Sequence, residues 1–418
     1  MKRTTFLKIA GSAFASLFAS KATSAPKEFQ ETKQTNEPFK FTLKPYIVSL
    51  TNSSAFIVFA TNKDCVADVK VVYPNKKVKR FYSSEQSSGV KHTGTLHQVY
   101  LYGLKAGEEF KFSVRATEII SRWDISRWKT KREEVGYGEC IKFEGENGEF
   151  LPFKVPQESD KIEFGVINDI HADIKRMKAH LSQMKNAEHI IMNGDMDNVL
   201  RSHNGILSRF LADLSDFTKC QIPLYYARGN HECRGEYAEY FSKYAPTAEG
   251  KTYCAFRRGP IFFLILDTGD TYENSDASTK WMIDFERWQT EEVQWLKKVI
   301  ASPEYKKAPF RVAFQHIPFF TKEMVKQKVR RANFDVYNTA KRRRFYDAVL
   351  KDANLDLLCC GHTHQHFFSN NAEDLSFPMI TNAREGMRIT ADNSKIEIEF
   401  IDDNGKIIRD KIIIKAKA

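Results

Sequence analysis

The stretch 162–171 reads IEFGVINDIH, an apolar run that is followed at once by Asn, Asp and His. A short apolar run bounded by polar residues predicts a buried strand. Four later runs have the same form, because each ends in Asp, Asn or His, at 189–195, 223–232, 311–316 and 355–364. Amphipathic segments of helical periodicity lie between them. This alternation predicts an α/β layered domain over residues 159–418.

The polar residues that follow these runs are candidates for one shared cleft. In open α/β sheets, ligands bind outside the carboxyl ends of the strands. The candidates are Asp169, His171, Asp195, Asn230, His316, His362 and His364. Each has an ordinary explanation when taken alone, as a helix cap, a turn residue or a buried histidine. Together they supply nitrogen and oxygen ligands for two metal ions, which favours transition metals over calcium or an iron–sulfur cluster.

Two details sharpen this prediction. His362 and His364 are two residues apart and directly follow Gly361, so both imidazoles can face one point while the glycine allows a tight turn or a close approach. One carboxylate must bridge two cations held about 3.5–4 Å apart. Asp195 lies in the middle of the series and is the natural candidate for the bridge.

The series of motifs resembles that of the calcineurin-like metallophosphoesterase superfamily, DxH, GD, GNH[DE], H and GHxH, over residues 162 to the C-terminus. The resemblance implies a four-layer α/β/β/α sandwich with two divalent or trivalent transition metal ions, Fe, Mn or Zn. It implies a first metal held by Asp169, His171, Asp195 and His364. It implies a second metal held by Asp195, Asn230, His316 and His362. His231 would be the acid that faces the leaving group or the transferring phosphoryl oxygens.

The residues themselves are compatible with this chemistry. Two cations lower the pKa of a bound water and produce a nucleophile at neutral pH, so no Ser or Cys nucleophile is required. Asp173 and Glu232 are candidates for orienting the imidazoles from behind. Glu232 could equally be a salt-bridge residue.

The N-terminal part has a different sequence pattern. Short strand-like runs at 45–50, 54–60, 67–73, 96–101 and 110–115 predict an all-β sandwich over residues 39–132. Within it, 101–110 resembles the late-strand corner of a fibronectin type III-like domain. Residues 133–158 are expected to be a linker or extension. Near the C-terminus, 402–405 reads DDNG, which predicts a hairpin whose strands complete a second sheet.

A sandwich followed by such a catalytic domain resembles the purple acid phosphatases. This chain departs from their pattern twice, because it has His171 where they have glycine and Asn198 where they have a metal-ligating tyrosine. Without a tyrosinate ligand, the purple charge-transfer colour is not expected. Asn198 and His203 are instead candidates for contacts with the substrate. A polar helix-cap region is an equally good explanation of Asn198.

Residues 1–25 have a basic start, an apolar run and small residues near the end, which predicts an export signal, and 26–38 reads as a polar linker. No later segment resembles a membrane span. Export permits disulfides, and of the seven cysteines a Cys233–Cys254 bridge is plausible.

The formal charge of +11 is compatible with anionic substrates but is common in other proteins too. A helix is expected to carry the basic residues of 326–331 and 341–344, either as a solvated face or as a means to attract anions to the cleft. Aromatic residues are not interleaved with them as a nucleic-acid platform needs, so no nucleic-acid partner is expected.

The predicted function is that of an exported, metal-dependent, acid phosphatase-like phosphoesterase, acting on small phosphomonoesters in preference to diesters. One alternative is a phosphodiesterase that acts on cyclic nucleotides, phospholipid head groups or nucleic acid. A second is a surface binding protein whose catalytic domain has decayed, although an intact ligand set argues against decay.

Overall fold

The computed structural model describes residues 37–83, 89–121, 135–157, 159–332, 345, 347–370 and 375–417. The expected export signal, 1–25, lies outside the described residues, as does nearly all of the linker at 26–38. Phe39–Ala418 make one compact unit. Among the described residues, no helix is long and apolar enough to span a membrane.

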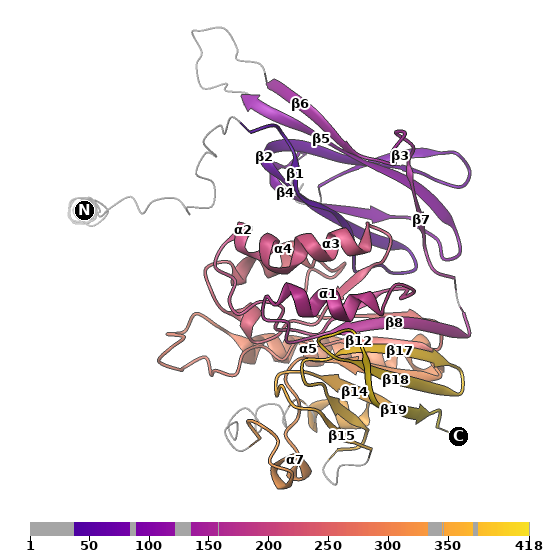
Figure 1. Cartoon of the computed structure of the whole chain (residues 1–418), viewed down its shortest axis with the longest axis vertical. Helices are drawn as coiled ribbons and strands as arrows, with labels where there is room; N and C mark the ends of the chain where they lie inside the picture. The colour runs from indigo at the N-terminus through magenta and orange to yellow at the C-terminus, as the bar shows by residue number, and fades with distance from the viewer. Residues whose placement is uncertain are drawn as a thin grey trace, which may run out of the picture. The chain divides into compact units, whose positions relative to one another are not determined.

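Two sheets support the predicted cleft (Figure 1). In the first, three short parallel strands lie side by side, β8 (Lys161–Ile167), β9 (Ile190–Met192) and β10 (Leu224–Tyr226). The second sheet has the order β11 (Cys254–Arg258), β12 (Ile261–Ile265), β13 (Phe310–Phe314), β14 (Leu357–Cys360), β16 (Met379–Thr381) and β15 (Phe367–Ser369). All the apolar runs predicted to be strands in this region are strands. The carboxyl ends of the parallel strands therefore present the polar residues that follow them.

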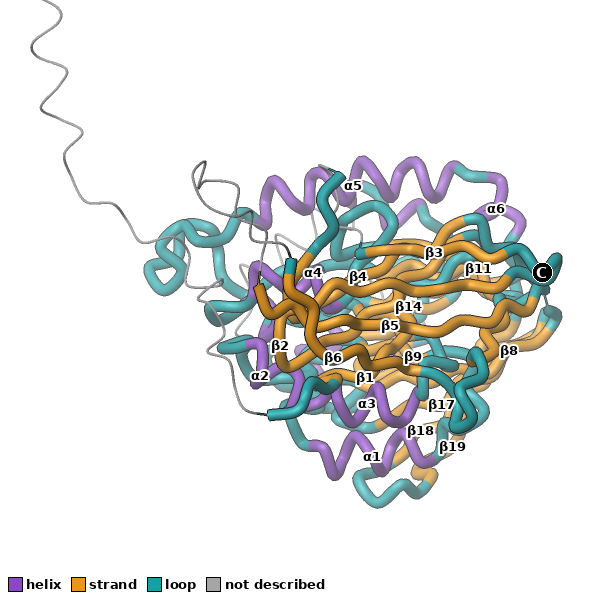
Figure 2. Tube along the Cα trace, turned by 90° about the horizontal axis from the view of Figure 1, so that it is seen from above, coloured by secondary structure: helices purple, strands orange, loops and turns teal. Residues whose placement is uncertain are grey.

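Helices cover the outer face of each sheet, as Figure 2 shows with α1 and α3 on one side of the strands and α5 and α6 on the other. Beside the first sheet lie α1 (Ile174–Ser182), α2 (His203–Ile206), the π-helix η2 (Leu207–Leu211), α3 (Ala212–Thr218) and α4 (Phe241–Tyr244). Beside the second lie α5 (Phe285–Ala301) and α6 (Pro303–Lys307), and α7 (Lys322–Lys326) follows β13. The described residues also include three short 3-10 helices, η3 (His231–Cys233), η4 (Ala238–Tyr240) and η5 (Leu350–Asp352).

Three apolar cores separate these layers. Between the sheets, the rings of Phe164 and Phe263 lie 5.1 Å apart and edge to face, a geometry that aromatic pairs prefer. A second core joins α1 and α3 to the outer face of β9, and a third joins α5 and α6 to the outer face of β12 and β13. Each fully buried side chain of this size contributes about 1.5–3 kcal/mol. The predicted α/β/β/α layering of residues 159–418 is confirmed.

The C-terminal hairpin lies at the predicted residues, but it belongs to a different sheet from the one expected. β18 (Lys395–Ile401) and β19 (Ile407–Lys415) are joined by a turn in which the Gly405 amide donates to the Asp402 carbonyl at 3.0 Å. Instead of completing the second sheet, the hairpin extends the first one, because β17 (Gly386–Asp392) pairs antiparallel with both β18 and β8. The local turn sequence specifies a hairpin and contains nothing about the edge on which it docks.

The N-terminal runs are also strands, namely β1 (Phe41–Val48), β2 (Ser54–Val72), β3 (Val78–Tyr82), β4 (Thr93–Tyr102) and β5 (Glu109–Ser121). Two runs that were expected to be separate strands merge into the long β2, whose pairing with β4 shifts register between Ala60 and Cys65. The segment expected to be a linker carries β6 (Gly136–Phe143) and β7 (Leu151–Lys154), which both pair with β5. β1 pairs in parallel with β10 at Val48 and Leu224, so the N-terminal strands and β8–β10 belong to one hydrogen-bonded sheet.

The cysteines form no disulfide. All seven lie in the part of the chain that the structure describes, and all are free thiols. The expected Cys233–Cys254 bridge is therefore wrong. Burial raises the pKa of both thiols, which keeps them protonated and unreactive at neutral pH.

Candidate metal centre

The polar residues that follow five strands meet at one edge of the two sheets. Asp169 and His171 follow β8, Asp195 follows β9, Asn230 and His231 follow β10, His316 follows β13, and His362 and His364 follow β14. The side chains of Asp169, Asp195 and His316 are at most 1% exposed, whereas those of His171, His364 and His231 are 11%, 12% and 20% exposed. The site thus has a buried floor and a rim of three histidines.

Unusual backbone conformations aim these side chains inward. Asp169, His171, Asp195, His362 and His364 all have φ between 49° and 70°, a region that residues other than glycine seldom adopt. Such strain costs of order 1–3 kcal/mol per residue and is concentrated at functional sites. Hydrogen bonds between the loops hold it, since the amides of Asp169 and His171 donate to the carbonyls of Gly194 and Asp195 at 3.0 Å.

Gly361 allows the close approach that its position predicts. A Cβ atom at this residue would lie 2.5 Å from Oδ2 of Asp169. The same Asp169 oxygen accepts a 2.9 Å hydrogen bond from the backbone amide of His362. The glycine therefore brings the β14 loop against the β8 loop, so that His362 and His364 can reach the ligands of the first sheet.

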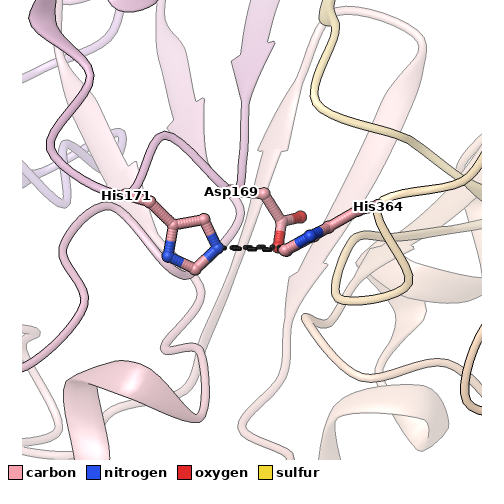
Figure 3. A group of neighbouring side chains, drawn as sticks. All are labelled: Asp169, His171 and His364. Carbon is pink, nitrogen blue, oxygen red and sulfur yellow. Dashed lines mark hydrogen bonds and ion pairs between the residues drawn. The ribbon is translucent and has the colours of Figure 1, made fainter.

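The first group of ligands is Asp169, His171 and His364, drawn in Figure 3. Nε2 of His364 lies 3.0 Å from Oδ1 of Asp169 and 3.0 Å from Nε2 of His171, which itself lies 3.7 Å from the same oxygen. Oδ1 of Asp169 is buried, and no described residue reaches it with the geometry of a hydrogen bond. A cation placed among the three atoms would satisfy them all, which a proton shared by two of them cannot do.

The second group is Asp195, His316 and His362, and a third comprises Asp195, His171 and His231. Nε2 of His316 lies 3.0 Å from Oδ2 of Asp195, and Nδ1 of His362 lies 2.8 Å from Oδ1 of Asn230. Asp195 also lies 4.0 Å from Nε2 of His171 in the first group. The Asp195 carboxylate thus stands between the two sets, where a bridging ligand must be. The donor set fits two transition metal cations.

Hydrogen bonds on the far side of the rings fix their orientation. Nδ1 of His316 contacts the carbonyl of Asn193 at 2.8 Å, and Nδ1 of His231 contacts the carbonyl of Asn198 at 2.6 Å. When each Nδ1 donates, Nε2 is left facing the site, which is how ligating imidazoles are usually held. The side-chain oxygen of Asn198 makes the same kind of contact with Nδ1 of His171, at 2.9 Å.

The two residues expected to contact substrate therefore have different surroundings. Asn198 touches two site histidines and stands where it positions them. His203 lies at the start of α2, where Nδ1 meets the Tyr244 hydroxyl at 2.7 Å, and it is in none of the three ligand groups. Of the two residues expected to orient imidazoles, Asp173 instead caps α1 by accepting the Arg176 amide at 3.0 Å.

Glu232 holds two ligand loops together without touching an imidazole. Its carboxylate is fully buried and accepts four hydrogen bonds, at 2.8 to 2.9 Å, from the backbone amides of Asp195, Met196 and Gly229 and from the Tyr226 hydroxyl. Burial, and after it the charge of Asp195, raises its pKa above the usual value. A salt bridge was the alternative role expected for Glu232. Its contacts instead show that it holds the backbone of the two ligand loops together, a role called the clamp below.

The buried charges of the site compensate one another. Burial acts to raise the pKa of Asp169, but His316, His171 and His364 together lower it well below its ordinary value. The same holds for Asp195, whose pKa is lowered chiefly by His316. Conversely, burial acts to lower the pKa of His316, whereas Asp195 and Asp169 raise it from 6.5 to about 9. In the metal-free protein, His316 is therefore an imidazolium at neutral pH.

This charge state predicts that metal uptake releases a proton from His316. A cation binds only the neutral imidazole, so titration calorimetry in buffers of different ionisation enthalpy should show release of about one proton per chain at pH 7.5. The release should fall away as the pH rises through 9. The same raised pKa affects the stability of the metal-free protein. It contributes stability that is fully present below pH 6.5 and is lost as the pH passes 9. Proton release that does not change between pH 7.5 and 10 would contradict the assignment.

The arginines beside the centre were not singled out as site residues from the sequence. Helix α7 ends at Lys326, so Arg330 and Arg331 lie in a loop rather than on the expected helix. Arg330 Nη1 lies 2.7 Å from Nδ1 of His364, and Arg384 Nη2 lies 2.9 Å from the same atom. Residues 341–344, the other half of the expected basic helix, lie outside the described residues. A cluster of basic residues shortly before GHTH was the only available signal.

Comparison with known proteins agrees with this geometry. Residues 162–366 match the family model of calcineurin-like phosphoesterases. Among solved structures, the purple acid phosphatase PPD1 from seeds of yellow lupin (Lupinus luteus) is similar in fold, with a TM-score of 0.54 and 12% sequence identity, covering 89% of this chain and 74% of that one. No curated protein matches in sequence.

Two further structures resemble the chain more weakly. GAP50, the anchor in the inner membrane complex of Plasmodium, has a TM-score of 0.42 and 15% identity, covering 62% of this chain and 90% of its own. A dimetal phosphatase from Danio rerio has a TM-score of 0.41 and 12% identity, covering 61% of this chain and 99% of its own.

Proposed function

Because residues 162–366 form a calcineurin-like phosphoesterase domain, we propose that this protein is a dinuclear-metal phosphoesterase that hydrolyses small phosphate esters, phosphomonoesters in preference to diesters. The observation that carries the proposal is the position of Asp195, whose carboxylate lies between two sets of nitrogen and oxygen ligands. Asp169, His171, Asp195 and His364 would hold one cation, and Asp195, Asn230, His316 and His362 the other. Fe, Mn and Zn all suit these ligands.

The bound cations would supply an activated water and neutralise charge on the phosphoryl oxygens. The residues of the chain position the reacting groups, exclude bulk water and admit the substrate. The buried floor fixes the geometry and excludes bulk water, since Asp169, Asp195 and His316 are almost wholly inaccessible. The rim of His171, His231 and His364 is where a substrate can enter.

His231 is placed to act as the acid. Its Nδ1 contacts the Asn198 carbonyl at 2.6 Å, and its Nε2 faces Asp195 at 3.7 Å from Oδ2. With Nδ1 donating to the carbonyl, Nε2 is the nitrogen that faces the site, and it is from Nε2 that an imidazolium would pass a proton to the leaving-group oxygen. His231 is also the most exposed of the three rim histidines, so it can touch the ester directly.

Replacing His231 by Asn should lower kcat by about 10²–10⁴-fold while both metals stay bound. The loss should grow as the leaving group becomes more basic, because an alkoxide needs the proton more than a nitrophenolate does. The measurement is kcat for p-nitrophenyl, phenyl and alkyl phosphates, together with metal content. An equal loss for all three esters would mean that His231 stabilises the phosphoryl oxygens and donates no proton.

The preference for monoesters is supported by the positive charge beside the rim. Arg330 and Arg384 both lie against His364, and a dianionic monoester gains more from such charge than a monoanionic diester does. The test compares p-nitrophenyl phosphate with bis(p-nitrophenyl) phosphate after loading with Mn or Zn. A higher kcat/KM for the monoester is expected. A higher value for the diester would favour the phosphodiesterase, and no hydrolysis of either would favour a binding protein.

We also propose that the chain is exported through the signal at 1–25 and that residues 39–132 are a fibronectin type III-like sandwich. The first rests on the basic, apolar and small residues of that segment. The second rests on the alternating strands and on the resemblance of 101–110. N-terminal sequencing of the protein from its native host would test export, since a mature chain should begin near residue 26.

A further inference from the structure

We propose that Arg330, Arg331 and Arg384 form a subsite for a second phosphate group, so that the preferred substrates carry one phosphate on the metals and another on these arginines. The inference rests on the proposed function, because it assumes that a phosphate ester or anhydride occupies the metal centre. It adds the class of substrate, namely a diphosphate such as a nucleoside diphosphate or inorganic pyrophosphate.

The three guanidinium groups converge on the two histidines of the β14 loop. Arg330 Nη1 and Arg384 Nη2 lie 2.7 and 2.9 Å from Nδ1 of His364, and Arg331 Nη1 lies 3.0 Å from Nε2 of His362. They come from separate parts of the chain, because two follow α7 whereas Arg384 lies between β16 and β17. Two segments thus deliver like charges to one place.

These charges have no acidic partner in the described part of the chain: none of the three arginines lies within ion-pair distance of a described carboxylate. Nearby Arg176, by contrast, lies 2.9 Å from Asp403. Burial, followed by the charge of Arg176 and then that of Arg330, lowers the pKa of Arg384, and the more distant carboxylates of Asp169 and Asp403 offset this only in part. Arg331 and Arg384 are partly buried and Arg330 is exposed. Like charges held this close together repel one another, and a bound anion would reduce that repulsion.

The hydrogen bonds point to the same conclusion. Nδ1 of His364 has a single lone pair, so it cannot accept fully from both Arg330 and Arg384. When Nε2 of this ring binds a metal, the neutral imidazole carries its hydrogen on Nδ1, which then becomes a donor as well. Ligating imidazoles usually turn this N–H toward a carboxylate or a carbonyl. Here it faces two guanidinium groups, and no described residue supplies an acceptor.

A phosphate group suits this place. It offers several acceptor oxygens, and the planar guanidinium binds phosphate through paired hydrogen bonds. Arg330 and Arg384 contact the Nδ1 edge of His364, whereas the Nε2 edge faces Asp169. One imidazole ring therefore separates them from the phosphoryl group on the metals, which places them beside the next group of the substrate. His364 is 12% exposed and Arg330 is exposed, so a ligand can reach them.

The test measures binding of two probes to the metal-loaded, full-length protein by titration calorimetry. The probes are methylenebisphosphonate, which carries two phosphate-like groups, and inorganic phosphate. In the double variant Arg330→Gln/Arg384→Gln, the preference for methylenebisphosphonate over phosphate should fall by about tenfold or more. Lys326→Gln removes a similar charge four residues from Arg330, from a side chain that is 81% exposed, and should leave the preference unchanged. Melting temperature and metal content establish that the variants are folded and loaded.

An unchanged preference, or equal weakening of both probes, would overturn the subsite, the latter because the arginines would then contact the scissile phosphate itself. The two proposals can fail separately. Hydrolysis of aryl phosphates with no effect of the arginines on probe preference would retain the phosphoesterase and remove the subsite. If the metal-loaded protein hydrolysed no ester, but its preference for methylenebisphosphonate over phosphate still depended on the arginines, the subsite would be retained and the phosphoesterase removed. Activity on adenosine diphosphate against phenyl phosphate, measured in the same variants, should follow the binding preference.

Discussion

Asp195→Ala is expected to release both metal ions and to reduce kcat/KM for aryl phosphates by about three orders of magnitude or more. The carboxylate lies 3.0 Å from His316 and 4.0 Å from His171, one in each ligand group. Its loss removes a ligand from both cations and so removes several kcal/mol of transition-state stabilisation. The measurement is metal content per chain after desalting, with steady-state kinetics on the same preparation.

Asp173→Ala is the matched control for this variant. Asp173 is two residues from His171, but its side chain caps α1 and lies in none of the ligand groups. The control should cost about 1 kcal/mol of stability and leave metal content unchanged. If Asp195→Ala kept both metals and its turnover, the bridging role would be wrong.

Glu232→Gln should destabilise the protein by about 3 kcal/mol or more and weaken the binding of both metals. The buried carboxylate accepts from the amides of Asp195, Met196 and Gly229 and from Tyr226. A glutamine has one acceptor oxygen, and its NH₂ group would face backbone donors that then lack a partner, each at a penalty of about 1–3 kcal/mol. Chemical denaturation of the metal-free protein measures the loss, and metal competition measures the weaker binding.

Glu236→Gln provides the comparison, because Glu236 is an exposed residue four positions further along the same segment. It should change stability by no more than about 0.5 kcal/mol. Equal stability of the two variants would show that the four contacts of Glu232 do not hold the loops together, and the clamp would have to be abandoned.

The strands of the catalytic region and the polar residues at their ends could be predicted because both depend on local sequence. An apolar run indicates a buried strand, and the polar residue after the run indicates which side chain lies at the carboxyl end of that strand. This was sufficient to bring Asp169, Asp195 and His316 into one site, although they are far apart in the chain. The spacing of His362 and His364 after Gly361 predicted that both imidazoles face the site, whereas their assignment to different ligand groups came from the family resemblance.

Contacts that depend on tertiary docking could not be predicted in this way. The C-terminal hairpin was recognised, but it joins the first sheet through β17, which pairs with β18 on one side and β8 on the other, and the sequence of β17 does not specify an edge. The pairing of β1 with β10 likewise depends on tertiary docking and could not be predicted from local sequence. Asn198 was expected to touch substrate because of its position in the motif, and only the fold shows that it meets His171 and His231.

The arginines illustrate a second reason. A basic run in a sequence is usually a solvated surface, and composition does not tell which of its members point toward a site. Arg384 lies in a different segment from Arg330, so their meeting at His364 could not be predicted from the sequence alone.

The central claim is that this edge of the two sheets holds two cations, and metal analysis of the purified full-length protein tests it most directly. After loading with Mn or Zn and removal of free metal, the account predicts two transition metal ions per chain, with phosphate-ester hydrolysis that is lost on chelation and restored on reloading. A protein that binds no transition metal, or that hydrolyses phosphate esters equally well without it, would contradict the account.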